Sequence, residues 1–200
     1  MKKLWNEYHT PQTVEEASAL LASYAGAARV IAGGTDLILE MEQGHKPPVA
    51  ALVDVTAIQE LTTIRQEGEF VTVGAGVTHT QLVGSTLLAA RATCLVESCG
   101  VVGGPQVRNV ATLGGNIAHA LPAADGTTSL MALDAEAEIA QHGTRRWLPL
   151  VELFSGPGQS LLDSTRDLLL NVRFRLAGPR EASAFKRIMR PQGVALPVLG

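Results

Sequence analysis

Two glycine pairs mark positions in this sequence where a main chain could come close to a ligand. The first pair lies in Ala32-Gly33-Gly34-Thr35-Asp36, directly after the short apolar run 29–32. Glycines after a strand let the backbone approach a ligand and turn successive N–H groups toward it. A helix predicted over 37–43 adds N-terminal donors, which favour an anion such as a pyrophosphate. A tight strand-to-helix turn without any ligand explains the same residues, so this motif alone leaves both interpretations open.

The two polar residues of this bend offer different chemistry. Thr35 adds a hydroxyl donor, whereas the carboxylate of Asp36 beside a phosphate is repulsive. We therefore expect the Asp36 side chain to turn away or to cap the following helix, and its backbone to face the ligand.

The second glycine pair lies in Thr112-Leu113-Gly114-Gly115-Asn116-Ile117. The same logic predicts close backbone approach at the glycines, with Thr112 and Asn116 as short polar anchors. Two such bends in one chain can hold different sections of one long ligand, and a dinucleotide fits that description. Neither bend reads G-x-G-x-x-G, so a Rossmann nicotinamide site is not indicated.

Other residue types that carry chemistry are sparse. Cys94 and Cys99 lack C-x-x-C spacing, and two thiols alone do not hold an iron–sulfur cluster, so we expect buried free thiols. We expect His79 and His119 to be surface or core histidines rather than catalytic ones. The sequence contains no evident Ser/His/Asp set or metal-ligand cluster.

The elements that must position the bends form a small α/β lobe (1–56), a larger α+β lobe (57–178) and a short remainder (179–200). Thr13 and Glu16 form a capping box at the start of the first helix. Thr78 and Gln81 form another. Hydrophobic periodicity predicts helices over 14–24, 37–43, 87–99 and 123–133, and strands over 29–32, 50–53, 62–65, 70–73, 135–140, 146–150 and 168–174.

Composition indicates a globular chain and excludes some partners. The chain has 200 residues, 46% hydrophobic and 18% charged, with a formal net charge of −3 and no block of Lys or Arg. Nucleic acid and anionic membranes are therefore poor candidates as partners. The N-terminal residues lack the apolar run of a signal peptide, and no apolar stretch is long enough to span a bilayer. We expect a cytoplasmic protein without membrane insertion.

Several motifs together resemble one protein family. Residues 29–36 and 107–117 are similar to the two flavin loops of the FAD-binding medium subunit of the molybdenum hydroxylases, the xanthine dehydrogenase and carbon monoxide dehydrogenase family. Pro122-Ala123-Ala124-Asp125 follows at the family's spacing, and Phe185-Lys186-Arg187 resembles its later lysine motif. The resemblance covers nearly the whole chain.

The resemblance implies a fold and a set of cofactor contacts. The fold is an α+β, two-lobed FAD-binding PCMH-type architecture, shared with vanillyl-alcohol-oxidase-like enzymes. Asp125 is expected to hydrogen-bond FAD hydroxyls, Leu169 to pack on the flavin and Lys186 to lie near the isoalloxazine; taken alone, these could be a helix cap, a core residue and a surface lysine. The cofactor-binding residues so implied are Arg29, Val30, Ile31, Ala32, Gly33, Gly34, Thr35, Asp36, Thr112, Leu113, Gly114, Gly115, Asn116, Asp125, Leu169 and Lys186.

The resemblance also implies an electron-transfer role in a complex. A large subunit would carry the molybdenum cofactor and a small subunit two [2Fe–2S] clusters, whose electrons pass to FAD and then to NAD⁺, oxygen or a quinone. No acid or base is required of this chain. Two alternatives are a non-catalytic docking module of the same complex and a stand-alone flavin oxidoreductase of the same fold.

The sequence departs from the family after the lysine motif. Residues 193–200 look like the opening strand of a C-terminal domain, most of which is lacking, so we expect a fragment or a natural truncation that ends in an unpaired apolar strand. Residues 190–193 also lack an aromatic residue that stacks on the flavin in some relatives.

Overall fold

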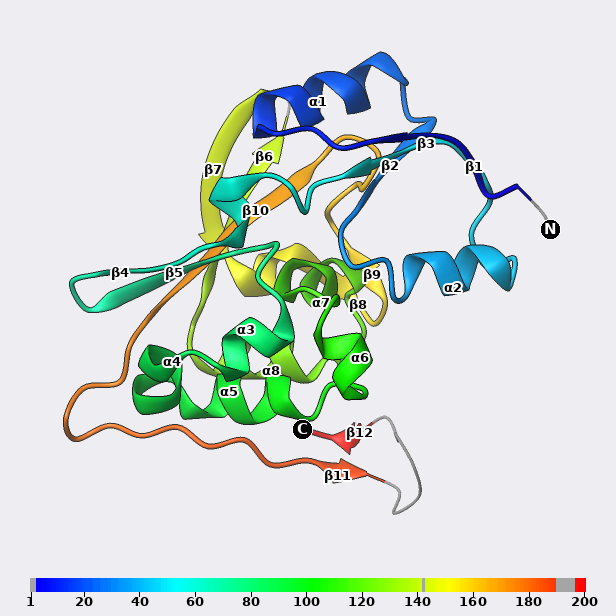
Figure 1. Ribbon diagram of the computed structural model, residues 1–200. Helices are drawn as coiled ribbons and strands as arrows, with labels where there is room; N and C mark the ends of the chain where they lie inside the picture. The colour runs from blue at the N-terminus through cyan, green and yellow to red at the C-terminus, as the bar shows by residue number, and fades with distance from the viewer. Residues whose placement is uncertain (1–2, 142, 190–196) are drawn as a thin grey trace.

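A three-stranded parallel sheet forms the first lobe (Figure 1). The structure, a computed structural model, describes residues 3–141, 143–189 and 197–200. The strands pair in the order β1-β3-β2, and helices α1 and α2 connect them. The bounds are β1 (Trp5–His9), α1 (Val14–Ser23), β2 (Ala28–Ile31), α2 (Leu37–Glu42) and β3 (Val49–Asp54).

Helix α1 forms because its apolar residues recur at helical spacing and bury one face, with Val14, Ala17 and Leu21 in the core. The Thr13 hydroxyl accepts from the Glu16 N–H at 3.1 Å, as the sequence predicts. The Glu16 carboxylate accepts from the Gln12 N–H at 2.8 Å instead of from Thr13, so the cap closes one residue earlier than in a capping box.

A five-stranded antiparallel sheet forms the second lobe, with strand order β4-β5-β10-β6-β7. Its bounds are β4 (Ile64–Glu67), β5 (Phe70–Gly74), β6 (Glu136–Gln141), β7 (Thr144–Pro149) and β10 (Leu168–Arg175). Short 3-10 turns (Gln59–Thr62 and Leu150–Leu153) and the small hairpin β8 (Phe154–Gly156) and β9 (Gln159–Ser160) join these elements.

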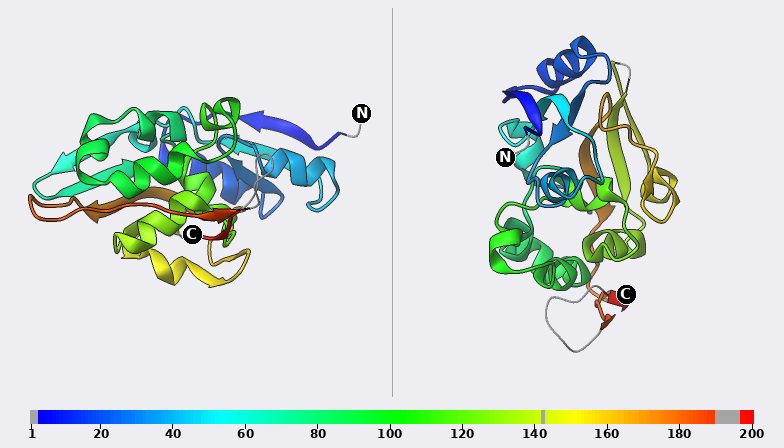
Figure 2. Two further views of the ribbon diagram at one scale, coloured as in Figure 1. Left: turned by 90° about the horizontal axis from the view of Figure 1, so that it is seen from below. Right: turned by 90° about the vertical axis from the view of Figure 1, so that its right-hand side faces the viewer.

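Helices cover one face of this sheet. They are α3 (His79–Val83), α4 (Thr86–Arg91), α5 (Thr93–Gly100), α6 (Pro105–Arg108), α7 (Leu113–His119) and α8 (Asp125–Ala132). Apolar side chains of the sheet and of the helices form one buried cluster between them, which includes Val73, Leu95 and Phe174. Figure 2 shows the first lobe at one end of the molecule and these helices at the other, with β10 between.

A β-bulge in β10 decides which way its side chains point. The register to β6 shifts between Leu169 and Asn171. Because strand residues alternate between faces, the extra residue places both Leu169 and Val172 on the helical side, although they are three residues apart. Leu168 and Leu170 pack instead against the first lobe. The bulge thus turns Leu169 toward the space between the lobes.

The two lobes share a hydrophobic core. Leu168 and Leu170 of β10, with Ala140 of β6, belong to the same buried cluster as Val14 and Leu21 of α1. Ile58 and Leu61, just beyond the predicted boundary at residue 56, lie in this cluster too. The lobe limits at 56 and 178 stay predictions, but the packing makes the two lobes one body.

Several local predictions are confirmed and others are wrong. The Thr78–Gln81 capping box is present in full, and both cysteines are free and buried. The predicted helix 87–99 is two helices, because the backbone of Ala92 leaves the helical region (φ −148°, ψ 50°) to bury its side chain in the core. Strand β1 does not follow from the sequence pattern, because apolar and polar residues do not alternate along Trp5–His9.

The structure tests only part of the prediction for the C-terminal residues. Residues 190–196, which include the segment without a stacking aromatic residue, lie outside the described residues. The expectation of an unpaired terminal strand is wrong for the part described: β12 (Pro197–Leu199) pairs antiparallel with β11 (Ile188–Met189). In the described ranges no helix is both long enough and apolar enough to cross a bilayer.

The shared core predicts that the lobes unfold together. The chain has two tryptophans, Trp5 on β1 and Trp147 on β7, so each reports one lobe. The variants Trp5→Phe and Trp147→Phe each keep one tryptophan. In each variant, the denaturant midpoint measured by tryptophan fluorescence should coincide with the midpoint measured by circular dichroism. A tryptophan midpoint that departs from the circular dichroism midpoint of the same variant would contradict the single shared core.

Candidate functional site

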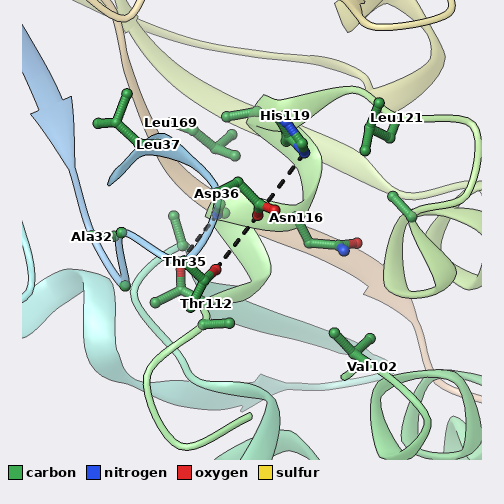
Figure 3. A pocket seen from close by; sticks show the side chains of 18 of the residues that line it. Ala32, Thr35, Asp36, Leu37, Val102, Thr112, Asn116, His119, Leu121 and Leu169 are labelled. Carbon is green, nitrogen blue, oxygen red and sulfur yellow. Dashed lines mark hydrogen bonds and ion pairs between the residues drawn. The ribbon is translucent and has the colours of Figure 1, made fainter. Parts of the chain in front are cut away.

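A cavity of about 430 Å³ opens between the two lobes. Its wall includes nearly all the residues that the sequence nominated, and Figure 3 shows side chains from the two bends round one opening. Leu113 is not part of the wall, because its side chain is fully buried in the core. Lys186 is exposed and lies outside the wall as well. The nominated residues in the wall are Arg29, Val30, Ile31, Ala32, Gly33, Gly34, Thr35, Asp36, Thr112, Gly114, Gly115, Asn116, Asp125 and Leu169.

The first bend lies directly against the segment that leads into the second. A Cβ atom on Gly33 would sit 2.1 Å from the carbonyl oxygen of Val110 and 2.9 Å from Cα of Ala111. No side chain fits at that separation. Gly33 is therefore required by contact between two backbones, and this contact brings the two bends together.

The first bend presents a row of free main-chain donors. In the described part of the chain, the N–H groups of Gly33, Gly34, Thr35 and Asp36 have no acceptor. Gly34 adopts φ +69°, a conformation that turns successive N–H groups toward one side. Such a concave row of amides binds anions, and phosphate is the anion that the sequence predicted here.

The second bend is built differently from the prediction. It is the first turn of α7, with Thr112 as N-cap, and the backbone donors of residues 113–115 are already used. The N–H groups of Leu113 and Gly114 donate to the carbonyls of Val77 and Ala75, and Gly115 donates to the Thr112 hydroxyl. A Cβ on Gly114 would lie 2.6 Å from that of Ala75. Gly114 thus serves packing of the protein, and the N–H groups of residues 113–115 are not free to bind a ligand.

The second bend instead offers side-chain groups. The Asn116 Oδ1 atom accepts from the N–H and the hydroxyl of Thr127 at 3.0 and 3.1 Å. These two bonds fix the side-chain amide, and its Nδ2 group keeps both hydrogens free of any acceptor in the described residues. Asn116 points into the opening in Figure 3. Asn116 can therefore donate to a ligand.

An ion pair forms part of the cavity wall. Asp125 Oδ2 accepts from Arg187 Nη1 at 2.6 Å, with the two side chains only 6% and 15% exposed. Asp125 Oδ1 is buried and has no partner in the described residues. Burial raises the pKa of Asp125 above its ordinary value, although the Arg187 charge acts to lower it. A buried acceptor without a donor is the feature expected where a ligand hydroxyl completes the site.

A polar bridge joins the lobes in the cavity wall. His119 Nε2 lies 3.2 Å from Glu40 Oε1, and Glu40 also pairs with Lys46. Burial tends to raise the pKa of Glu40, but the Lys46 and His119 contacts outweigh it and hold the pKa below the ordinary value. Asp36 turns its carboxylate toward His119, 3.9 Å away, and does not cap α2. The expected helix cap is therefore wrong, and the orientation of this side chain relative to a phosphate stays a prediction.

Sequence reasoning did not assign to the site several polar residues of the cavity wall, among them His79, Asp167 and Arg187. His79 Nδ1 and Asp167 Oδ1 are buried and without a partner in the described residues. Burial, together with the charge of Arg108, lowers the pKa of His79 to about 4. The capping box did place His79 at a helix start, but its burial depends on the packing of α3 against distant segments. Arg187 directly follows Lys186, the residue that the resemblance placed near the isoalloxazine.

Comparison with known proteins adds independent findings. The profile of the family described as "FAD binding domain in molybdopterin dehydrogenase" matches residues 3–174. The nicotinate dehydrogenase FAD-subunit of Eubacterium barkeri is 31% identical over 97% of the chain. The carbon monoxide dehydrogenase medium chain of Hydrogenophaga pseudoflava is 33% identical over 94%. The chain spans 66% and 64% of the length of these two relatives.

A solved structure agrees with the fold. The carbon monoxide dehydrogenase structure from Hydrogenophaga pseudoflava that lacks the Mo-pyranopterin moiety superposes with a TM-score of 0.91 at 30% identity, over 98% of this chain and 68% of that one. The two-lobed PCMH-type fold expected from the sequence is thereby confirmed.

The contact between the bends predicts that Gly33→Ala destabilises the chain even without a ligand. Overpacking against a backbone should lower the free energy of unfolding by roughly 1–3 kcal/mol or more. Gly100→Ala is the matched control, since its Cβ would meet nothing nearer than Val83 Cγ2 at 3.9 Å. Urea unfolding of the ligand-free variants measures both. If Gly33→Ala were as stable as the control, the glycine would serve the ligand and not the packing.

The buried His79 predicts a pH-dependent stability. With a folded pKa of about 4 against an ordinary value of 6.5, the unfolded chain takes up a proton that the folded chain refuses, so stability falls as pH drops from 6.5 toward 4. Between pH 7.5 and 5 this amounts to about 2 kcal/mol by linkage. In the variant His79→Gln, the free energy of unfolding should fall by that much less between the two pH values, as measured by urea titration. Identical losses in both proteins would show that His79 titrates normally.

Proposed function

The chain belongs to the family of FAD-binding domains in molybdopterin dehydrogenase, and from this membership we propose that it holds FAD between its lobes as the electron-transfer subunit of a molybdenum hydroxylase. The observation that carries the proposal is the set of unsatisfied polar groups in one cavity. Free amides at one bend, a free Asn116 amide and a free Asp125 oxygen all border the same space. Asp125 Oδ1 is also buried, and buried polar groups normally have partners, so a polar ligand is expected there.

These groups match the parts of a dinucleotide. The amides of residues 33–36 would bind the pyrophosphate, and Thr112 and Asn116 would hold the adjoining chain from the other side. Asp125 would accept from a hydroxyl. Leu169, placed by the bulge in β10, would pack on a ring together with the apolar wall at Val102 and Leu121.

The protein's contribution is to bind, orient and shield. When bound, FAD would supply the redox chemistry, which none of the nominated side chains provides. The lobes enclose the cavity from two sides, and the Glu40–His119 contact joins them in its wall. No general acid or base is needed, because the chain would not act on the hydroxylated substrate.

The names of the relatives support the place of the chain in a complex. One relative is a FAD-subunit and another a medium chain of a dehydrogenase. We propose a large partner subunit with the molybdenum cofactor and a small one with [2Fe–2S] clusters. Electrons from those clusters would leave by way of this chain to NAD⁺, oxygen or a quinone.

The visible spectrum of the purified chain and of its complex tests this proposal. A flavin spectrum that needs partner subunits for turnover supports it, and metal analysis of the co-purified complex should find molybdenum and iron. A folded chain that takes up no added FAD would instead be a docking module. Turnover by the flavin-loaded chain alone would make it a stand-alone oxidoreductase.

Asn116→Asp is a sharp test of the site. The substitution keeps the acceptor for Thr127 but replaces the free amide donor by a negatively charged oxygen, so FAD affinity should fall roughly 10- to 100-fold. Asn109→Asp makes the same change of charge at an exposed residue outside the cavity. Isothermal titration with FAD compares the two. Equal affinities would remove Asn116 from the site.

A further inference from the structure

Arg187 reaches the cavity from a segment that belongs to neither sheet. Residues 177–187 run along the helices of the second lobe and are tied to them at several points (Figure 1). The Ala177 N–H donates to the Arg91 carbonyl, the Ser183 hydroxyl accepts from the Cys94 N–H, and the Phe185 N–H donates to Glu97. These bonds fix the course of the segment up to Arg187.

The guanidinium of Arg187 is held by two acceptors. Nη1 donates to Asp125 Oδ2 at 2.6 Å and to the Val101 carbonyl at 3.3 Å. Both Arg187 and Asp125 line the cavity. The contact joins residues 62 positions apart, so it places the segment and the start of α8 in one geometry.

The ion pair occupies only one of the two oxygen atoms of the Asp125 carboxylate. Asp125 Oδ2 is taken by Arg187, whereas Oδ1 has no partner in the described residues. Asp125 is buried, and a lone carboxylate in such a place tends to take up a proton. Ionised, it is the stronger acceptor for a hydroxyl.

We propose that Arg187 is a positioning residue for the cofactor: it orients the Asp125 carboxylate and balances its charge, so that Oδ1 accepts a hydrogen bond from a hydroxyl of FAD. This inference rests on the proposed function. It assigns to Arg187 a role that acts through Asp125, whereas the neighbouring Lys186 is exposed and lies outside the cavity wall.

Among the described residues that act on the charge of Asp125, Arg187 is the one that carries a positive charge. The thiol of Cys99 on α5 faces Asp125, and its pKa is raised to about 12 by burial, so it stays neutral. Asn116 of α7 and Thr127 of α8 lie nearby but do not titrate. Arg187 acts to lower the pKa of Asp125, against the effect of burial. Without Arg187 the carboxylate should protonate at a higher pH.

The test is FAD affinity as a function of pH, measured by isothermal titration on the chain and its variants from pH 5 to 8. For Arg187→Gln, affinity should fall as pH drops, with a midpoint above that of the wild type. The loss at the acidic end should be roughly tenfold or more, the size of one charge-assisted hydrogen bond. Arg187→Lys should restore the wild-type midpoint in part. Arg180→Gln, an exposed arginine outside the cavity, is the control and should not shift it.

The double variant Arg187→Gln with Asp125→Asn separates positioning from a merely structural role. Because the asparagine amide cannot ionise, the pH dependence introduced by Arg187→Gln should disappear. Wild-type binding with an unchanged midpoint in Arg187→Gln would overturn the inference and leave the proposed function intact. So would a midpoint shift that persists in the double variant. Absence of FAD binding by the folded wild type would instead overturn the proposed function itself.

Discussion

The close contact between Gly33 and the Val110 carbonyl is the constraint on which the rest of the site depends. The two backbones lie so near that a Cβ at Gly33 would be 2.1 Å from the carbonyl oxygen. Since the first bend belongs to one lobe and Val110 leads into α7 of the other, this contact sets how the lobes meet. Together with the shared core, it brings the free amides, Asn116 and the Glu40–His119 bridge into the wall of one cavity.

The two glycine pairs look alike in the sequence but have different structural roles. At the first, Gly34 in its left-handed conformation arranges four N–H groups without acceptors in the described structure. At the second, the backbone donors of residues 113–115 are used inside the protein, and side chains face the cavity instead. One bend therefore offers main-chain donors suited to phosphate, and the other offers an oriented amide and hydroxyl. Together they can grip one elongated molecule from opposite sides.

Local patterns predicted much of the fold, and contacts between distant segments decided the rest. Caps and periodicity placed α1, β2, α2 and the hairpins, because these depend on neighbours in the chain. The break at Ala92 and the bulge in β10 did not follow from local pattern, since tertiary packing imposes both. In the same way, most of the residues that the motifs predicted for the site do lie in the cavity wall. The motifs did not predict His79 or Asp167, because these residues are buried by segments that are distant in the sequence. They predicted Lys186 as a cavity residue, whereas its neighbour Arg187 lies in the wall.

The most direct test of the central claim is an amide NMR titration of the ¹⁵N-labelled chain with FAD. The backbone N–H resonances of residues 33–36 and the Asn116 side-chain amide should shift along one common saturation curve, because both bends hold the same molecule. The N–H groups of Leu113 and Gly114, which already donate to Val77 and Ala75, should move little. Saturation by FAD with the amides of residues 33–36 unmoved would contradict the account.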